Sequence, residues 1–413
     1  MLRRICHARV VLLGEATHGS AEFYRTRERI SRELIERKGF SFIAIEGDWP
    51  DAARIDHYVR HATYPASEWT AFALFPTWTW RNREVREFVD WLRKRNGLVE
   101  PGKRIAFHGL DLYSLYTSIR SILTYLDDID AQTAQVARQR YGCLTPWQAD
   151  PATYGHAALT GTYQTCEHEV VSMLSELLQK HRAYAEHDGE RFLDAVQNAK
   201  LVASAEQYYR IMCYGSRASW YLRDSHMFGT LQNLLHFHGP ESKAIIWAHN
   251  SHVGDSAATE MSVRGEYNIG HLCRQEFGSA AYCIGFGTDS GTVAAASDWD
   301  GPMEIKTIRP GQTVMSGCAT MPAARDSCCR CEKSNSGRPH RRPVEAPARA
   351  CHRRDLPARD GAAKSLFSGR APAPVRRIYL VRQDRSGYAV QDGRTRGASG
   401  YLSIRHVTCA SRS

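Results

Sequence analysis

Residues 9–50, RVVLLGEATHGSAEFYRTRERISRELIERKGFSFIAIEGDWP, decide the fold. The aliphatic run at 9–13 is too short for a helix and stops at Gly14, which predicts a buried strand. Residues 20–37 place apolar side chains among charges at helical spacing and end before a glycine, which predicts an amphipathic helix. Residues 40–46 predict a second buried strand. A strand, a helix and a strand form a βαβ unit, whose two strands we expect to be parallel.

Both predicted strands end in polar side chains. Glu15 and His18 follow the first strand, and Glu46 ends the second. Because the carboxyl ends of parallel strands meet at one edge of the sheet, we expect these three side chains to converge there. A histidine beside carboxylates is a credible general base, since the charges raise its basicity and a carboxylate can fix its tautomer. The alternative is structural: Glu15 caps the helix and His18 packs against it.

The composition is that of an ordinary globular protein, with 43% hydrophobic and 24% charged residues in a chain of 413. A chain of this length can bury a large core and form two or three domains. Its apolar runs are far shorter than the roughly 20 residues that a membrane-spanning helix needs. No export signal is readable at the start, so we expect a cytoplasmic location and no membrane partner.

The net charge of +10 comes from the last quarter of the chain. From residue 312 onward there are 20 Lys and Arg against 7 Asp and Glu, whereas residues 1–311 hold 34 against 37. The basic tail has no aromatic platform, so we expect no nucleic-acid partner. It also holds six of the twelve cysteines. A cytoplasmic chain should keep these tail cysteines reduced, and the absence of paired CxxC spacing argues against a zinc cluster.

The pattern along the chain predicts an α/β fold, with a mostly parallel sheet built in two halves and a large all-helical insertion between them. A third short strand is expected at 104–108, a fourth at 243–247 and a fifth at 281–286. The expected segments are the first α/β half (1–112), the helical insertion (113–240), the second α/β half (241–311) and a basic tail rich in Cys, Pro and Arg (312–413).

Further polar residues follow the later strands. Asp111 comes after the third strand, where it either joins the site or caps a helix. His249 and His252 come after the fourth strand and are unlikely core filler, because their polar atoms need partners. They could bind a metal together with His18, polarise a carbonyl, or orient a water. Residues 223–226, RDSH, lie on the last helix of the insertion, and we favour a salt-bridged face exposed to solvent over a functional role for them.

Taken together, these segments resemble the erythromycin esterase family over about residues 3–310. The residues that carry the resemblance are Arg27 and the motifs GEATHG (14–19), EGDWP (46–50), GLDLYS (109–114), WAHNSHV (247–253) and ASDWD (296–300).

The resemblance implies a hydrolase that opens an ester or lactone with an activated water and without a covalent serine intermediate. The absence of a Gly-x-Ser-x-Gly elbow agrees with this. His18 would be the general base, oriented by Glu46 or Glu15. The groups implied to neutralise the oxyanion are Arg27 and His249 or His252. Residues expected to contact the substrate are Trp49, Asp111 and Asn250. No cofactor is expected, although a divalent metal on His18, His249 and His252 is an open alternative.

Past Gly311 the resemblance stops. Residues 312–375 have no sustained period, which is typical of disorder. We hypothesise a shift of reading frame at about Pro310–Gly311, which the gene sequence would test. The resulting tail should pack poorly and destabilise the protein.

Three functional hypotheses therefore stand. The first is an ester hydrolase acting on a small-molecule ester or lactone. The second is a ligand-binding protein whose histidines hold a metal or haem, although the carboxylates Glu15, Glu46 and Asp111 favour hydrolysis because haem needs an apolar pocket. The third is an inactive relative damaged by its altered tail. Oligomeric state cannot be read from the sequence.

Overall fold

The structure is a computed structural model. It describes residues 5, 7–61, 72, 77–180, 184, 188–212, 216–288, 290–297, 301–308, 378–384 and 387–392. The junction at 310–311, residues 298–300 of the last family motif and the cysteines of the basic tail lie outside these ranges.

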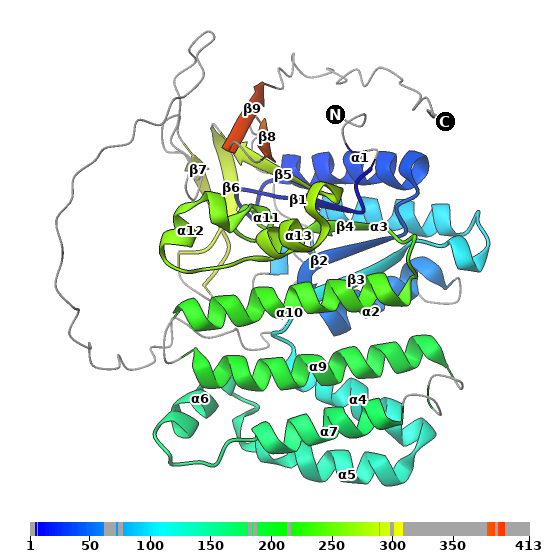
Figure 1. Cartoon of the computed structure of the whole chain (residues 1–413), viewed down its shortest axis with the longest axis vertical. Helices are drawn as coiled ribbons and strands as arrows, with labels where there is room; N and C mark the ends of the chain where they lie inside the picture. The colour runs from blue at the N-terminus through cyan, green and yellow to red at the C-terminus, as the bar shows by residue number, and fades with distance from the viewer. Residues whose placement is uncertain are drawn as a thin grey trace, which may run out of the picture.

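A parallel sheet forms the centre of the fold (Figure 1). Its parallel strands, in spatial order, are β3 (Ala106–Asp111), β2 (Phe42–Asp48), β4 (Ala244–Trp247), β1 (Val10–Leu13) and β5 (Ala281–Thr288). β4, from the second half of the chain, lies between β1 and β2 from the first half. The prediction of an α/β fold with a mostly parallel sheet is confirmed.

The two faces of the sheet support two hydrophobic clusters, because successive side chains of a strand point in opposite directions. In β1, Val11 and Leu13 belong to a cluster with apolar residues of α1 (Ala21–Lys38) and α3 (Arg83–Asn96). Val10 and Leu12 belong to the cluster on the other face, with the helices that follow β3. Both faces are therefore covered, as the continuous apolar runs of the strands require.

The helices between β3 and β4 cover one face of the sheet in successive layers (Figure 1). They are α4 (Leu115–Ile129), α5 (Ala131–Tyr141), η5 (Gly142–Trp147), α6 (Pro151–Leu159), α7 (Glu167–Gln179), α9 (Gly189–Ile211) and α10 (Ser216–Phe237). α10 lies between the sheet and α9. These helices share one hydrophobic cluster with the sheet, so the segment between β3 and β4 is continuous with the core of the α/β fold.

The remaining elements connect the strands and extend the sheet. They are α2 (Trp49–Arg60), η3 (Thr77–Thr79), η4 (Pro101–Lys103), α11 (Asn250–Val253), η6 (Ser256–Ala258), α12 (Glu260–Val263), α13 (Ile269–Phe277), η7 (Gly278–Ala280) and the antiparallel pair β6 (Gly291–Ala295) and β7 (Glu304–Ile308). The tail also contributes β8 (Ile378–Asp384), antiparallel to β5, and β9 (Gly387–Asp392), antiparallel to β8. The sequence predicted no strands at these two segments, whereas residues 312–375, for which disorder was expected, lie outside the described ranges.

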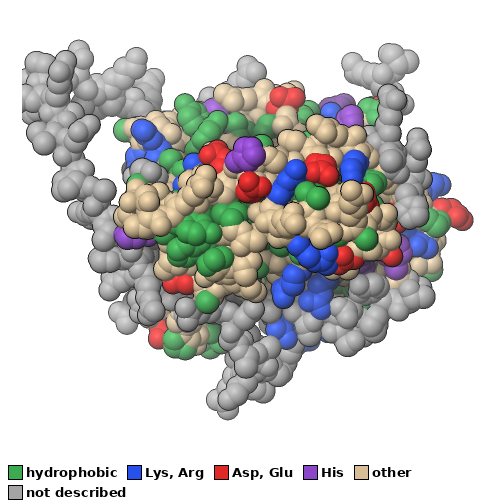
Figure 2. Space-filling view, turned by 90° about the horizontal axis from the view of Figure 1, so that it is seen from below, with side chains coloured by type: hydrophobic (Ala, Val, Ile, Leu, Met, Phe, Trp, Pro, Cys, Tyr) green, Lys and Arg blue, Asp and Glu red, His purple; other side chains and the backbone are tan. Residues whose placement is uncertain are grey.

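Three features of the described residues bear on the sequence expectations: the apolar length of the helices, the charge of the surface and the pairing of cysteines. Among the described residues, none of the helices is long and apolar enough to cross a membrane. Figure 2 views the lower helical layer, where acidic, basic and apolar side chains are interspersed. Cys143 and Cys166 form a disulfide within this layer, whereas the tail cysteines, which were expected to be reduced, lie outside the described residues.

Candidate active site at the carboxyl edge of the sheet

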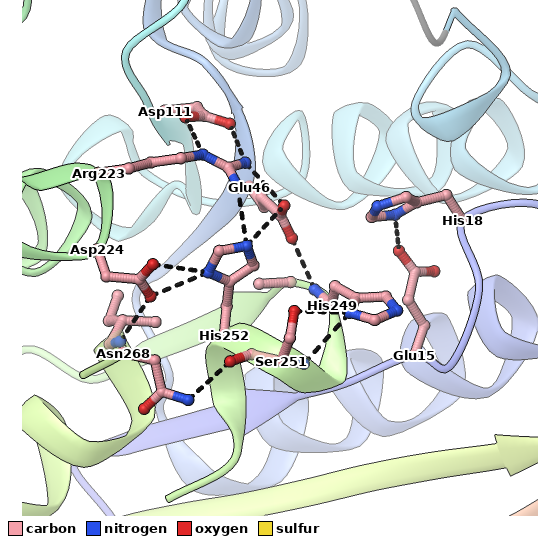
Figure 3. Close-up of polar contacts among 12 residues, drawn as sticks. Glu15, His18, Glu46, Asp111, Arg223, Asp224, His249, Ser251, His252 and Asn268 are labelled. Atoms are coloured by element: carbon pink, nitrogen blue, oxygen red, sulfur yellow. Dashed lines mark hydrogen bonds and ion pairs between the residues drawn. The ribbon is translucent and has the colours of Figure 1, made fainter. Parts of the chain in front are cut away.

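The polar residues predicted at the strand ends lie together at one edge of the sheet (Figure 3). Glu15 and His18 lie in the loop after β1, Glu46 and Asp111 near the ends of β2 and β3, and His249 and His252 directly after β4. The neighbouring registers of β1, β4, β2 and β3 bring these ends side by side. The convergence therefore follows from the parallel order of the strands.

His18 is held by Glu15. Its Nδ1 lies 2.7 Å from Oε1 of Glu15, whose carboxylate is fully buried. Burial lowers the pKa of His18, but the hydrogen bond and the charge of Glu15 outweigh it and raise the pKa above its ordinary value. The His18 side chain is 37% exposed, and no described residue forms a hydrogen bond with its Nε2. Glu15, and not Glu46, is thus the partner of His18, and Glu15 does not cap α1, which starts after Ser20.

The turn that carries His18 packs tightly against β6. The backbone N–H of Ala294 donates to the carbonyl of Gly19 at 3.0 Å. A Cβ at position 19 would lie 1.9 Å from the carbonyl oxygen of Ala294. Only glycine permits this approach, so β6 fixes the backbone beside His18.

Arg27 does not face the open site, contrary to the predicted contact with an oxyanion. Its guanidinium is completely buried and donates to Gly14 O at 2.9 Å, Glu15 Oε2 at 3.0 Å and Ala248 O at 2.7 Å. It therefore joins the ends of β1 and β4 and holds the carboxylate that orients His18.

The guanidinium that does face the site belongs to Arg223 on α10. It donates two hydrogen bonds to Asp111, at 2.9 and 2.6 Å, and a third to Glu46 Oε1 at 2.8 Å. Its side chain is 13% exposed, so the interpretation of residues 223–226 as a solvent-exposed face is wrong. The signal available in the sequence was that apolar residues flank this charged pair at 220–222 and 227–228, because ionised side chains within an apolar helical segment are rare unless functional or paired. Asp111 joins the site rather than capping α4, which starts after Ser114.

His252 lies between two carboxylates. Its Nδ1 is 2.9 Å from Oδ1 of Asp224, and its Nε2 is 3.2 Å from Oε1 of Glu46 and 2.9 Å from Nη1 of Arg223. Burial lowers the pKa of His252, but the charges of Asp224 and Glu46 raise it to about 9. Burial opposes the charged form of Glu46, yet His252 and Arg223 hold the pKa of that carboxyl well below its ordinary value.

His249 has the opposite environment. Burial and the neighbouring His18 lower its pKa to about 4, so the ring is neutral near pH 7. Its Nε2 lies 3.1 Å from Ala16 O, while its Nδ1 accepts a hydrogen bond from the backbone N–H of Ser251. Its own backbone N–H donates to Glu46 Oε2 at 2.7 Å. His249 thus caps α11 and contributes to holding Glu46.

Two of the predicted substrate contacts have structural partners. Trp49 is buried, stacks on His108 and donates from Nε1 to Asp194 at 2.7 Å. Asn250 forms two hydrogen bonds with the backbone of Phe286 in β5. Neither side chain is directed by these contacts toward His18, so the structure does not support a direct substrate contact for either residue.

The metal alternative does not match this arrangement. Both ring nitrogens of His249 and of His252 already contact protein groups. Over the described ranges, no group of three or more His, Cys, Asp or Glu side chains is placed to hold a metal ion. The absence of a cofactor stays a prediction, which treatment with a chelator would test.

The fold and site define an α/β protein with a histidine–carboxylate pair and a buried arginine–carboxylate network at the carboxyl edge of a parallel sheet. The chain belongs to the erythromycin esterase family, whose model matches residues 35–315. This match ends within a few residues of Gly311, where the resemblance read from the sequence stops.

Individual relatives are distant. The chain is 24% identical over 324 residues to the putative hydrolase YbfO of Bacillus subtilis, covering 73% of this chain and 68% of that one. It is also 24% identical over 285 residues to the erythromycin esterase type I of Escherichia coli, covering 63% and 64%. A Bacillus cereus crystal structure matches with a TM-score of 0.62 at 21% identity, covering 76% and 72%. A mutant of the erythromycin esterase EreC, in its open conformation, matches with a TM-score of 0.58 at 18% identity, covering 75% and 78%.

Proposed function

We propose that this protein hydrolyses an ester or lactone bond in a small molecule with a water activated by His18. The observation that carries the proposal is the Glu15–His18 pair, in which Nδ1 faces a buried carboxylate at 2.7 Å while the side chain stays 37% exposed. A histidine in this state has one nitrogen committed to orientation and the other available to a reactant.

In the proposed reaction, Nε2 of His18 removes a proton as the water oxygen attacks the carbonyl carbon. Glu15 accepts the hydrogen bond from Nδ1–H and stabilises the imidazolium that forms. The carbonyl oxygen becomes an oxyanion, for which Arg223 is the partly exposed cation of the site. The C–O bond to the leaving alcohol then breaks, and His18 returns the proton to that oxygen. The products are a carboxylic acid and an alcohol.

Water is a better-supported nucleophile than serine in this site. Ser251, beside the network, has its hydroxyl 2.8 Å from Nδ1 of His249, whose pKa of about 4 makes it a weak base. In the described part of the chain, His18 has no hydrogen bond to a serine. Ser204, another described serine that contacts a histidine, lies 3.0 Å from Nδ1 of His226, whose pKa is also lowered to about 4 by burial. Neither of these two serine hydroxyls therefore has a strong base beside it.

The family suggests a macrolide lactone as the first substrate to test, since relatives of this chain carry the name erythromycin esterase. Turnover would be measured by the mass gain of one water, with heavy-oxygen water to show which C–O bond breaks. We expect the heavy oxygen in the product carboxylate and not in the alcohol, because the proposed attack is at the carbonyl carbon, and we expect activity that survives a chelator. Loss of activity with the chelator would instead favour the metal-dependent alternative.

Variants would separate the remaining hypotheses. His18→Asn should abolish turnover, whereas His168→Asn, at a histidine whose side chain is 86% exposed, should not. A wild-type protein that unfolds cooperatively but fails on a panel of esters and lactones would contradict the proposal and favour a binding protein. A wild-type protein without a cooperative transition would indicate damage from the tail.

A further inference from the structure

A buried aspartate that the sequence placed on a solvent face contacts the ring of His252 (Figure 3). Asp224 on α10 has no exposed side-chain surface, and its carboxylate oxygens lie 2.9 and 3.0 Å from Nδ1 of His252. The backbone N–H of Ile269, the first residue of α13, donates to the same carboxylate at 2.8 Å. Asp224 is therefore held between two helices with its acceptor atoms directed at the ring.

The opposite side of the ring also has an excess of negative charge. Glu46 from β2 lies 3.2 Å from Nε2. Arg223 is the cation nearest to Glu46, but Asp111 from β3 already accepts two hydrogen bonds from that guanidinium. Nη1 of Arg223 also lies 2.9 Å from Nε2 of His252, where it donates only to an unprotonated Nε2. When Nε2 carries a proton, it donates to Glu46 instead and Nη1 has to move away. Three carboxylates thus share one arginine around His252, and a proton on the ring relieves the imbalance.

A third contact favours the same protonation state. The indole of Trp220 stacks on the His252 ring, with centroids 4.6 Å apart and planes 5° from parallel. The electron-rich face of tryptophan attracts a cation more than it attracts a neutral ring.

We propose that Asp224 is a positioning residue that keeps His252 protonated on both ring nitrogens near neutral pH, so that the site holds a fixed imidazolium beside Arg223. The imidazolium offsets the charges of Glu46 and Asp111. Without it, the oxyanion of the proposed hydrolysis would form beside an uncompensated carboxylate. Only this consequence for turnover rests on the proposed function, because the protonation state can be measured without a substrate.

The first experiment uses the full-length wild-type protein labelled with nitrogen-15 at histidine. The imidazole signals of His252 are assigned by their loss in His252→Gln. We expect both ring nitrogens to have imidazolium shifts at neutral pH, and the proton to leave only near pH 9. A bare Nε2 at neutral pH would overturn the proposal, whether or not the protein is an active hydrolase.

The second experiment compares Asp224→Asn with a matched control. Removal of an opposite charge at this distance should lower the midpoint of the His252 titration by about 1–3 pH units. The control is Asp255→Asn, which removes another aspartate that contacts a histidine, His271, at 2.9 Å. It should leave the titration of His252 unchanged.

The same variant gives a kinetic readout that a merely structural role would not move. For Asp224→Asn, the kcat/KM relative to wild type should fall at alkaline pH and recover on acidification, because His252 regains its proton. A relative kcat/KM that is reduced equally at every pH would contradict the positioning role. If Asp224→Asn does not fold, the wild-type titration still decides the protonation state.

Discussion

Replacement of Arg27 by lysine distinguishes a structural role from a role in binding the oxyanion. The guanidinium donates to Gly14 O, Glu15 Oε2 and Ala248 O, and it has no exposed surface. A single lysine ammonium cannot reach all three acceptors in their fork geometry. We expect it to keep the ion pair with Glu15 and to leave the two carbonyl oxygens without a donor.

The expected loss of stability follows from the two carbonyl oxygens, of Gly14 and Ala248, that lose their hydrogen-bond donor. A buried polar group that loses its partner costs about 1–3 kcal/mol, so Arg27→Lys should lower the free energy of unfolding by about 2–6 kcal/mol. Typical domains have a free energy of unfolding of about 5–15 kcal/mol, so the variant should still fold at low temperature. Turnover should fall as well, because the loops that carry Glu15 and His249 lose their connection.

The assay is urea unfolding of wild type, Arg27→Lys and the control Arg25→Lys, with kcat measured on the same samples. Arg25 lies on the same helix, is 59% exposed and pairs with Glu84, so its replacement should change stability by less than about 1 kcal/mol. If Arg27→Lys kept the wild-type unfolding midpoint but lost turnover, the structural argument would be refuted. A direct contact with the oxyanion would then be the better explanation.

Three further predictions concern other parts of the site. His18→Asn should lower kcat by at least about 10²-fold with little change in thermal midpoint, because the side chain is 37% exposed; a large drop in the midpoint would contradict this. For His252, the folded pKa is raised from 6.5 to about 9, which corresponds to about 3 kcal/mol of stability. That stability is fully present below about pH 6.5 and lost as pH rises through about 9, so urea midpoints should fall across this range in wild type and less in His252→Gln. Gly19→Ala should impair folding or turnover, since its Cβ would lie 1.9 Å from Ala294 O; unchanged kinetics and stability would show that β6 does not fix the turn.

The general plan of the sheet could be predicted from local pattern. Short aliphatic runs that stop at turn residues identified the five parallel strands, and the helical spacing between the third and fourth runs identified the covering helices. Because parallel strands present their carboxyl ends at one edge, Glu15, His18 and Glu46 could be expected to meet. These inferences use the order of residues along the chain and a single packing rule.

The partners of each side chain could not be predicted in this way. Arg27 and Arg223 both lie on amphipathic or apolar helices, and sequence spacing does not say which guanidinium faces the open site. The choice depends on the position of α10 between the sheet and α9, which places Arg223 above the ends of β2 and β3. The strands β8 and β9 were missed because β8 pairs with β5, nearly a hundred residues away in sequence, and long-range pairing leaves little local signal.

By itself, the sequence determined the α/β class, the edge of the sheet where the polar residues gather, and the family. The tertiary structure decided which carboxylate orients His18, which arginine is buried and which faces the site, and the opposite protonation states of His249 and His252. The physical reason is that these properties depend on burial and on charges within about 4 Å. Such neighbours come from elements as far apart in the sequence as β2 and α10, and only the packed fold brings them together.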